Sequence, residues 1–147
     1  MGRSMGVVAL AALLAGPALA DQARARFTVS AVVPKRVTLT ALEQPAQLTL
    51  SSEDIERGYK EVSARYRVQH NDPHGYLLHL VARIGLTRLV EVRGLATDVE
   101  LGDTDLAIRQ ASAGRLDEFE LAFRFVLDPE ARPGSYALPV HVTAAPL

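Results

Sequence analysis

Three of the four histidines lie within ten positions and are the residues of this chain best suited to chemistry. They stand in the run His70-Asn-Asp-Pro-His74-Gly-Tyr-Leu-Leu-His79, with the carboxylate of Asp72 between the first two. Imidazole nitrogens and a carboxylate are ligands that zinc or copper accepts in proteins. The Asn-Asp-Pro-His-Gly stretch is typical of a turn, so the tip of a hairpin would gather these side chains. The segment therefore carries a candidate metal or small-ligand site.

These four residues also have a simpler interpretation. His70 and His74 would flank an exposed turn, while His79 would lie several residues along the next strand, at roughly 3.3 Å per residue. No further residues in the pattern that orients metal ligands accompany them. We therefore expect no bound metal and no other cofactor, and we keep a metal or small-ligand site over residues 70–79 as the alternative.

Other kinds of chemistry find little support in the composition. The 147 residues include no cysteine, which removes disulfides, thiolate zinc sites, iron–sulfur clusters and cysteine nucleophiles. No serine lies in G-x-S-x-G or S-x-x-K, the arrangements that expose and activate a hydroxyl. The formal net charge of -1 provides no field that would attract nucleic acid. We expect neither an enzyme nor a nucleic-acid-binding protein.

The first 20 residues have the three parts of an export signal in order. Arg3 is the positive charge, residues 7–14 are an apolar stretch, and residues 18–20, Ala-Leu-Ala, offer the small side chains that a signal peptidase accepts. A membrane anchor is the alternative, but the apolar stretch is shorter than the roughly 20 residues that span a bilayer. We therefore expect residues 1–20 to be removed, residues 21–147 to form the mature domain, and no membrane span to remain.

Along the mature chain, apolar side chains recur at every second position rather than at helical spacing. The clearest case is residues 118–128, where five apolar side chains alternate with other residues: Phe119, Leu121, Phe123, Phe125 and Leu127. A pleated strand places such residues on one face, whereas a helix cannot. We predict strands over that segment and over residues 27–33, 36–40, 47–50, 62–70, 76–83, 89–92, 98–101, 106–110 and 136–143.

Turn residues separate these strands and predict the fold class. Asn, Asp, Gly and Pro cluster between them, as at residues 71–75 and 128–134. Short strands at such spacing are typical of an antiparallel sandwich, so we expect an all-β, Ig-like β-sandwich of about 7–9 strands. Residues 51–58 predict one short helical turn, since serines that can cap a helix, acidic residues and a final glycine follow in order. Residues 133–136, Pro-Gly-Ser-Tyr, predict a corner whose tyrosine hydroxyl bonds the backbone.

Two segments at the ends of the mature chain carry a family resemblance. Residues 25–40, ARFTVSAVVPKRVTLT, and residues 133–147, PGSYALPVHVTAAPL, resemble the first strand and the terminal turn and strand of secreted bacterial β-sandwich subunits of the spore-coat-U and fimbrial type. The resemblance implies an exported Ig-like domain that polymerises or decorates a cell surface through strand exchange. This chain lacks the cysteine that these families carry soon after the first strand.

These features together predict an exported, non-enzymatic structural or protein-interaction module of the periplasm or cell surface. Its partner would be another protein or a second copy, bound through a sheet edge by strand addition. Residues 24–33 are the candidate added strand, because they follow the cleavage site and alternate cleanly. The alternative is that these residues pair within their own sheet as an ordinary first strand.

Overall fold

The computed structural model describes residues 28–83, 85–112 and 114–147. The chain divides into two parts after Val32, and every helix and strand of the described residues belongs to the second part. These elements are β1 (Val37–Glu43), β2 (Gln47–Leu50), α1 (Ser52–Arg57), β3 (Tyr59–His70), β4 (Tyr76–Ala82), β5 (Thr87–Arg93), β6 (Val99–Leu101), β7 (Leu106–Gln110), β8 (Leu116–Leu127), β9 (Gly134–Ala137) and β10 (Val140–Pro146). The predicted all-β fold with one short helical turn is confirmed.

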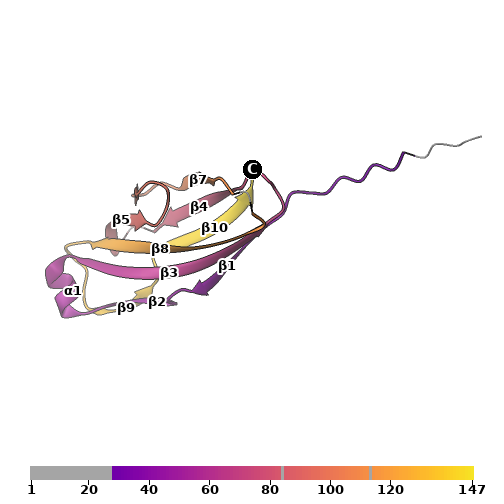
Figure 1. Ribbon diagram of the computed structural model, residues 1–147. Helices are drawn as coiled ribbons and strands as arrows, with labels where there is room; N and C mark the ends of the chain where they lie inside the picture. The colour runs from indigo at the N-terminus through magenta and orange to yellow at the C-terminus, as the bar shows by residue number, and fades with distance from the viewer. Residues whose placement is uncertain (1–27, 84, 113) are drawn as a thin grey trace, which may run out of the picture. The chain divides into compact units, whose positions relative to one another are not determined.

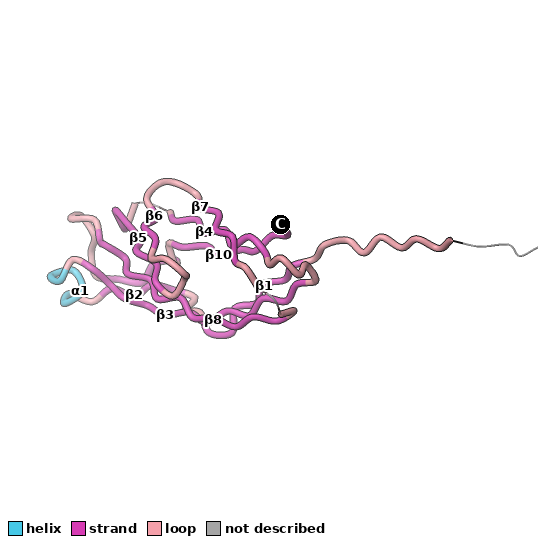
Figure 2. Tube along the Cα trace, turned by 45° about the horizontal axis from the view of Figure 1, so that its top comes forward, coloured by secondary structure: helices cyan, strands magenta, loops and turns pink. Residues whose placement is uncertain are grey.

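The strands form two main sheets and a small third one. The larger sheet has the order β1-β3-β8-β5-β6, the second has the order β10-β4-β7, and β2 pairs with β9 alone. All pairings in the described residues are antiparallel. Figure 1 shows β3 and β8 as the long central strands, and Figure 2 shows the three-stranded sheet lying apart from them. The two main sheets therefore form the layers of a sandwich.

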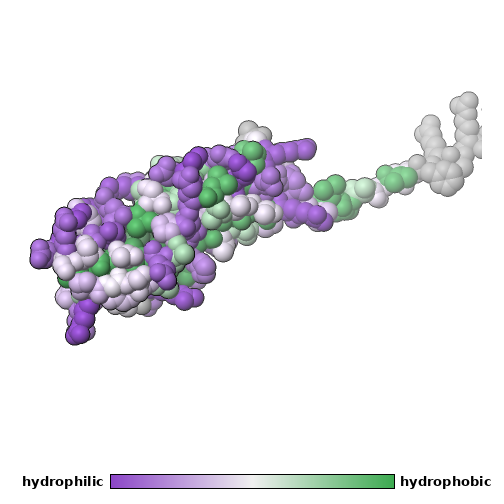
Figure 3. Space-filling view, turned by 90° about the horizontal axis from the view of Figure 1, so that it is seen from below, coloured by the Kyte–Doolittle hydropathy of each residue, from purple (hydrophilic) through white to green (hydrophobic). Residues whose placement is uncertain are grey.

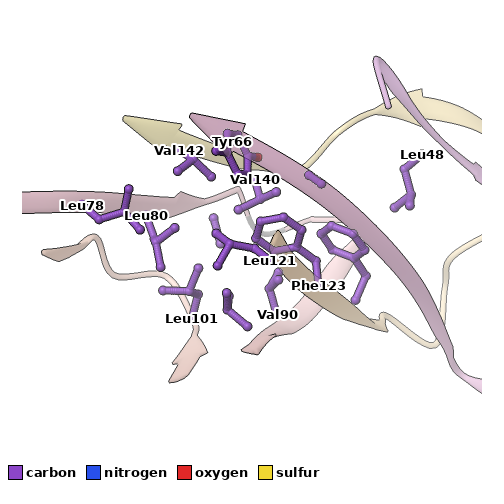
Figure 4. Close-up of a cluster of buried hydrophobic side chains, with 14 of the residues drawn as sticks. Leu48, Tyr66, Leu78, Leu80, Val90, Leu101, Leu121, Phe123, Val140 and Val142 are labelled. Atoms are coloured by element: carbon purple, nitrogen blue, oxygen red, sulfur yellow. The ribbon is translucent and has the colours of Figure 1, made fainter. Parts of the chain in front are cut away.

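The core lies between these two layers and follows the alternation along β8. Leu121, Phe123, Phe125 and Leu127 are buried and Phe119 is partly buried, whereas the residues between them are exposed or only partly buried. Figure 4 shows side chains of the three-stranded sheet, such as Leu78 and Leu80, facing this row. The buried face of β8 predicted from residues 118–128 is thus confirmed, and the strand begins two residues earlier than expected.

The predicted strand over residues 27–33 is wrong for the part of it that the structure describes. Residues 28–33 form no strand, and Val29, Val32 and Val33 are 90%, 92% and 75% exposed. Figure 3 shows apolar surface along this segment. Alternation defines the two faces of a strand, but it does not supply the neighbouring strand whose backbone must hydrogen-bond to its N–H and C=O groups. Residues 1–27 lie outside the described residues, so removal of residues 1–20 stays a prediction.

The predicted strand over residues 136–143 is in fact two strands that belong to different sheets. β9 pairs with β2, and β10 pairs with β4. Leu138 and Pro139 separate them, and Pro139 has no amide hydrogen with which to continue a ladder. With this division, the described residues contain ten strands, close to the number expected for the sandwich. The predicted tyrosine corner is confirmed, because the Tyr136 hydroxyl donates to the carbonyl oxygen of Arg132 at 2.8 Å.

α1 begins with a capping box, as its serine and acidic residues suggested. The amide of Asp54 donates to Ser51 Oγ at 3.2 Å, and Asp54 Oδ2 accepts from the Ser51 amide at 3.0 Å. Lys60 Nζ donates to the same carboxylate oxygen at 2.8 Å. Gly58, with φ of 79°, ends the helix in the left-handed conformation that glycine adopts readily. The hydrogen bonds from Lys60 and Ser51 lower the pKa of Asp54 to about 2.

We expect Asp54→Asn to lower the free energy of unfolding at pH 7 by about 1 kcal/mol and to flatten its dependence on acid. The folded-state pKa of Asp54 lies below its usual value of 3.8, so its stabilisation is present above about pH 4 and is lost as pH falls toward 2. Urea unfolding from pH 7 to pH 2.5 measures both effects. Glu53→Gln, which changes an exposed carboxylate of the same helix, is the control. An equal acid dependence in Asp54→Asn and the parent protein would contradict this prediction.

β8 has a strand partner along nearly its whole length on one side only. β3 pairs with residues 116–126, but β5 pairs only with residues 122–127. β5 ends where Gly94 lies with its backbone against the carbonyl oxygen of Glu120. Within the described chain, residues 116–121 therefore have no strand partner on the β5 side, and we call them the free section of β8.

Candidate functional site

His70 ends β3 on the core-facing side of the strand, not on an exposed turn. Its side chain is 0% exposed, and its ring centroid lies 5.2 Å from that of Tyr76. The Nδ1 atom lies 2.8 Å from the carbonyl oxygen of Asp72, which can only accept a hydrogen bond. Nδ1 therefore carries a hydrogen, and in the neutral ring Nε2 is an acceptor. Nε2 has no hydrogen-bond partner in the described chain.

The carboxylate of Asp72 is used by the turn itself. Oδ1 accepts from the backbone amide of His74 at 2.9 Å, and Oδ2 pairs with Lys35 Nζ at 2.7 Å. These two hydrogen bonds, the one from Lys35 first, lower the pKa of Asp72. Next to it, Asn71 accepts from the amide of Arg36 at 2.7 Å and donates to the carbonyl oxygen of Pro34 at 2.8 Å. The turn thus anchors the chain just before β1.

The four candidate metal ligands do not converge. His74 is exposed, and His79 lies on the face of β4 opposite to the buried Tyr76 and Leu78. The carboxylate of Asp72 binds Lys35 Nζ and the backbone amide of His74, so it is not directed at an imidazole ring. Across the described ranges, no three His, Cys, Asp or Glu residues are placed to hold a metal ion.

A different set of polar residues gathers at this end of the sandwich. Four core-facing rows each end in a polar side chain: Val68 is followed by His70 in β3, Leu78 by Tyr76 in β4, Ile108 by Gln110 in β7, and Phe119 by Asp117 in β8. The register brings the ends together, because Tyr76 pairs with Gln110, and Val68 pairs with Asp117. The interior between the sheets is therefore polar at this end.

The contacts within this polar cluster are centred on Asp117. Ser112 Oγ donates to Asp117 Oδ1 at 2.8 Å, and His70 Nε2 lies 3.7 Å from Asp117 Oδ2. Burial, together with the negative charge of Asp117, raises the pKa of Tyr76 to about 12. The Nε2 atom of Gln110 is buried without a hydrogen-bond partner in the described chain. Ser112 donates its hydroxyl hydrogen bond to the carboxylate of Asp117 rather than to His70. The described residues therefore lack the arrangement in which a serine nucleophile donates to a histidine base.

A cleft opens beside this cluster with a volume of about 490 Å³. Tyr76, Gln110, Ser112 and Asp117 line one part of it. The remaining lining residues come from the β5–β6 loop, the β7–β8 loop and the free section of β8: Gly94, Leu95, Ala96, Ala111, Gly114, Leu116, Glu118 and Phe119. We call this hollow the end cleft.

Sequence reasoning found His70 but missed Gln110, Ser112 and Asp117. The signal was present in the alternation, because Gln110 and Asp117 occupy positions that continue the apolar rows of their strands. A polar residue at such a position in one strand is ordinary. Only the register shows that such residues from four strands meet at one end.

Comparison with known protein families, with curated protein sequences and with solved structures finds no match for this chain. No helix among the described residues is long and apolar enough to cross a membrane.

Proposed function

We propose that this chain is an exported structural or protein-interaction module of the periplasm or cell surface, without enzymatic activity. In this proposal residues 24–33 of one copy add as a strand to a sheet edge of another copy. The observation that carries it is the exposed, alternating segment at residues 28–33, which forms no strand within the described chain. Residues 24–27 of the same segment lie outside the described residues.

The contacts that hold the chain just before β1 support the proposal that the preceding segment binds another molecule. Asn71 holds the backbone of Pro34 and Arg36, and Asp72 holds the side chain of Lys35. The chain is therefore fixed at Pro34–Arg36, directly after the exposed valines. Residues 28–33, which form no strand within the described chain, can offer their backbone groups to a neighbouring sheet. Ordering them on binding would cost about 1–2 kcal/mol per residue.

β10 is the edge best suited to receive this strand. It is the outer strand of its sheet, and its sequence VHVTAAP contains no Lys, Arg, Asp or Glu. The other edge strands of the two main sheets each carry a charge: Glu43 in β1, Glu100 in β6 and Arg109 in β7. Since charged side chains commonly protect an edge from added strands, β10 is the least protected. A hollow of about 430 Å³ borders the start of β10, and its lining includes Val140 of β10 and Ala41 of β1.

Deletion of residues 21–33 from the mature protein tests the proposal. We expect the intact mature protein to self-associate in sedimentation velocity as its concentration rises, and the deletion variant to be a monomer of unchanged stability. A peptide of residues 21–33 should then bind the deletion variant. Unfolding of the deletion variant would instead identify the segment as an ordinary first strand.

Matched substitutions test whether the alternating face makes the contact. Val29→Asp with Val33→Asp places two charges on one face of the segment and should abolish self-association. Thr28→Asp with Ser30→Asp adds the same charge on the other face and should weaken self-association far less. If the intact mature protein stays monomeric at high concentration and captures no partner from a periplasmic or surface extract, the proposal is overturned.

A further inference from the structure

The free section of β8 has unpaired backbone groups on its β5 side. Along an antiparallel strand, the N–H and C=O groups of one residue point to one neighbouring strand, and those of the next residue point to the other. The amide of His70, at the end of β3, donates to the carbonyl oxygen of Arg115 at 3.1 Å. Arg115 and every second residue after it therefore face β3, whereas Leu116 and Glu118 face the β5 side. No strand of the described chain lies there to pair with them.

Gly94 agrees with this alternation and limits the open edge. A Cβ atom added to Gly94 would meet the carbonyl oxygen of Glu120, so this oxygen also points to the β5 side. The backbone of Gly94 lies against it there, directly after the end of β5. The open edge therefore consists of Leu116 and Glu118, whose N–H and C=O groups are all available to an added strand.

The end cleft adjoins this open edge. Its lining includes residues 116–119 of the free section and residues 94–96 of the β5–β6 loop. Side chains of a strand alternate between its two faces, so a strand added beside Glu118 would direct the residues before and after its central position into the cleft. Leu95 and Phe119 are partly buried and provide apolar walls there. The volume of about 490 Å³ lies within the range of protein pockets that bind small groups.

The outer face of the free section is acidic. Glu118 and Glu120 both project from this face, two residues apart. Arg67 of β3 donates through Nε to Glu118 at 2.7 Å. Arg65, the register partner of Glu120, pairs with Glu43 instead, at 3.4 Å, so the charge of Glu120 is not balanced by its cross-strand neighbour. A long basic side chain placed opposite Glu118 would reach both carboxylates, since diagonal neighbours on one face of a sheet lie within its reach.

We propose that the open edge of β8, together with the end cleft, binds an extended segment of another protein in which one Lys or Arg stands between two small apolar residues. The basic side chain would lie opposite Glu118, and the apolar side chains would enter the cleft. Backbone hydrogen bonds give such a complex affinity, and alternate side chains give it specificity. An acidic segment, or the same edge of a second copy, would bring carboxylates together and is disfavoured.

This binding site is separate from the β10 edge and does not depend on self-association. β8 and β10 belong to different sheets, and no residue of β10 lines the end cleft. Amide chemical shifts distinguish the two sites, because a ligand at the open edge perturbs residues 116–119 whether or not the protein self-associates.

The blocked peptide acetyl-Thr-Val-Arg-Val-Thr-amide is the probe, because it has one arginine between two valines and no other charge. Titration of the mature protein with this peptide, followed by amide chemical shifts, should show saturable changes centred on residues 94–96 and 116–119. A peptide with glutamate in place of the arginine should bind about tenfold more weakly, because like charges then face each other.

Methylation of the peptide backbone tests whether a strand is added. The arginine opposite Glu118 would exchange both of its backbone hydrogen bonds with that residue, whereas the two valines would point their backbone groups away. Methylation of the backbone nitrogen of the arginine removes a donor and should weaken binding by at least about tenfold. Methylation of the second valine is the matched control and should have a clearly smaller effect.

Two variants test the protein side of the contact. Glu118→Lys should reverse the preference, so that the glutamate peptide binds more tightly than the arginine peptide. Leu116→Pro removes an N–H group that faces the open edge rather than β3, and should weaken binding of the arginine peptide. Asp105→Asn changes an exposed carboxylate that does not line the cleft, and should bind as the parent does.

Circular dichroism and urea midpoints establish that each variant is folded. If Leu116→Pro does not fold, Glu118→Lys and the methylated peptides decide the question. Absence of saturable binding of the arginine peptide would overturn the proposal, as would shift changes that leave residues 116–119 unaffected. An unchanged preference in Glu118→Lys, or equal losses from the two methylations, would have the same consequence.

Discussion

Phe123→Ala should lower the free energy of unfolding by about 3–5 kcal/mol, which is close to the whole stability of many domains. Phe123 lies in the middle of β8, is 1% exposed, and packs beside Phe125 with ring centroids 6.1 Å apart. Alanine would remove most of its buried surface and leave a cavity between two sheets whose backbones are held by their ladders. Equilibrium unfolding in urea, followed by circular dichroism, gives the value.

Val126→Ala is the matched control for Phe123→Ala. Val126 belongs to the same strand but to the opposite, partly buried face. We expect this change to cost less than about 1.5 kcal/mol. A loss below about 1 kcal/mol for Phe123→Ala would show that the assignment of the core face of β8 is inverted.

Gly94→Ala should lower the free energy of unfolding by at least about 2 kcal/mol. Gly94 has φ of 100°, where a side chain is strained, and an added methyl group would overlap the carbonyl oxygen of Glu120. Relief of this overlap requires β5 to move away from β8. Gly58→Ala separates the two causes, since Gly58 also has a positive φ but a Cβ added there would have no neighbouring atom within 4 Å. We expect about 1 kcal/mol for Gly58→Ala, and equal losses in the two variants would mean that the overlap has no cost.

Much of the fold was predictable because each strand carries its own local signal. The bounds of β2 and β7 coincide with the predicted residues 47–50 and 106–110. Ser51 and Gly58 bound α1 as expected. The main errors occur at residues 28–33 and 136–143, where the outcome depends on a partner strand. No window of sequence records which strand lies beside it, so pairing and order were beyond local reasoning.

The candidate site was predicted less well for the same reason. His70 and His79 are close in sequence, but alternation places His70 on the core-facing side of β3 and His79 on the outer side of β4. Gln110 and Asp117 come from later strands, and only the ladders of β7 with β4 and of β8 with β3 bring them beside Tyr76 and His70. Spacing along the chain therefore suggested the alternative of a metal or small-ligand site over residues 70–79, whose side chains do not converge in the described structure, and it missed the end cleft.

The central ladder of the larger sheet also determines how quickly this domain can fold. β3 and β8 join residues that are remote in the sequence, such as Tyr59 with Val126. Proteins dominated by such nonlocal contacts refold on the order of milliseconds to seconds, because a long loop must close before the contacts form. A chain emerging from the ribosome has no central partner for β3 until Leu127 has been synthesised. Folding is therefore expected to follow translation, and the protein must remain soluble while its longest strands are still unpaired.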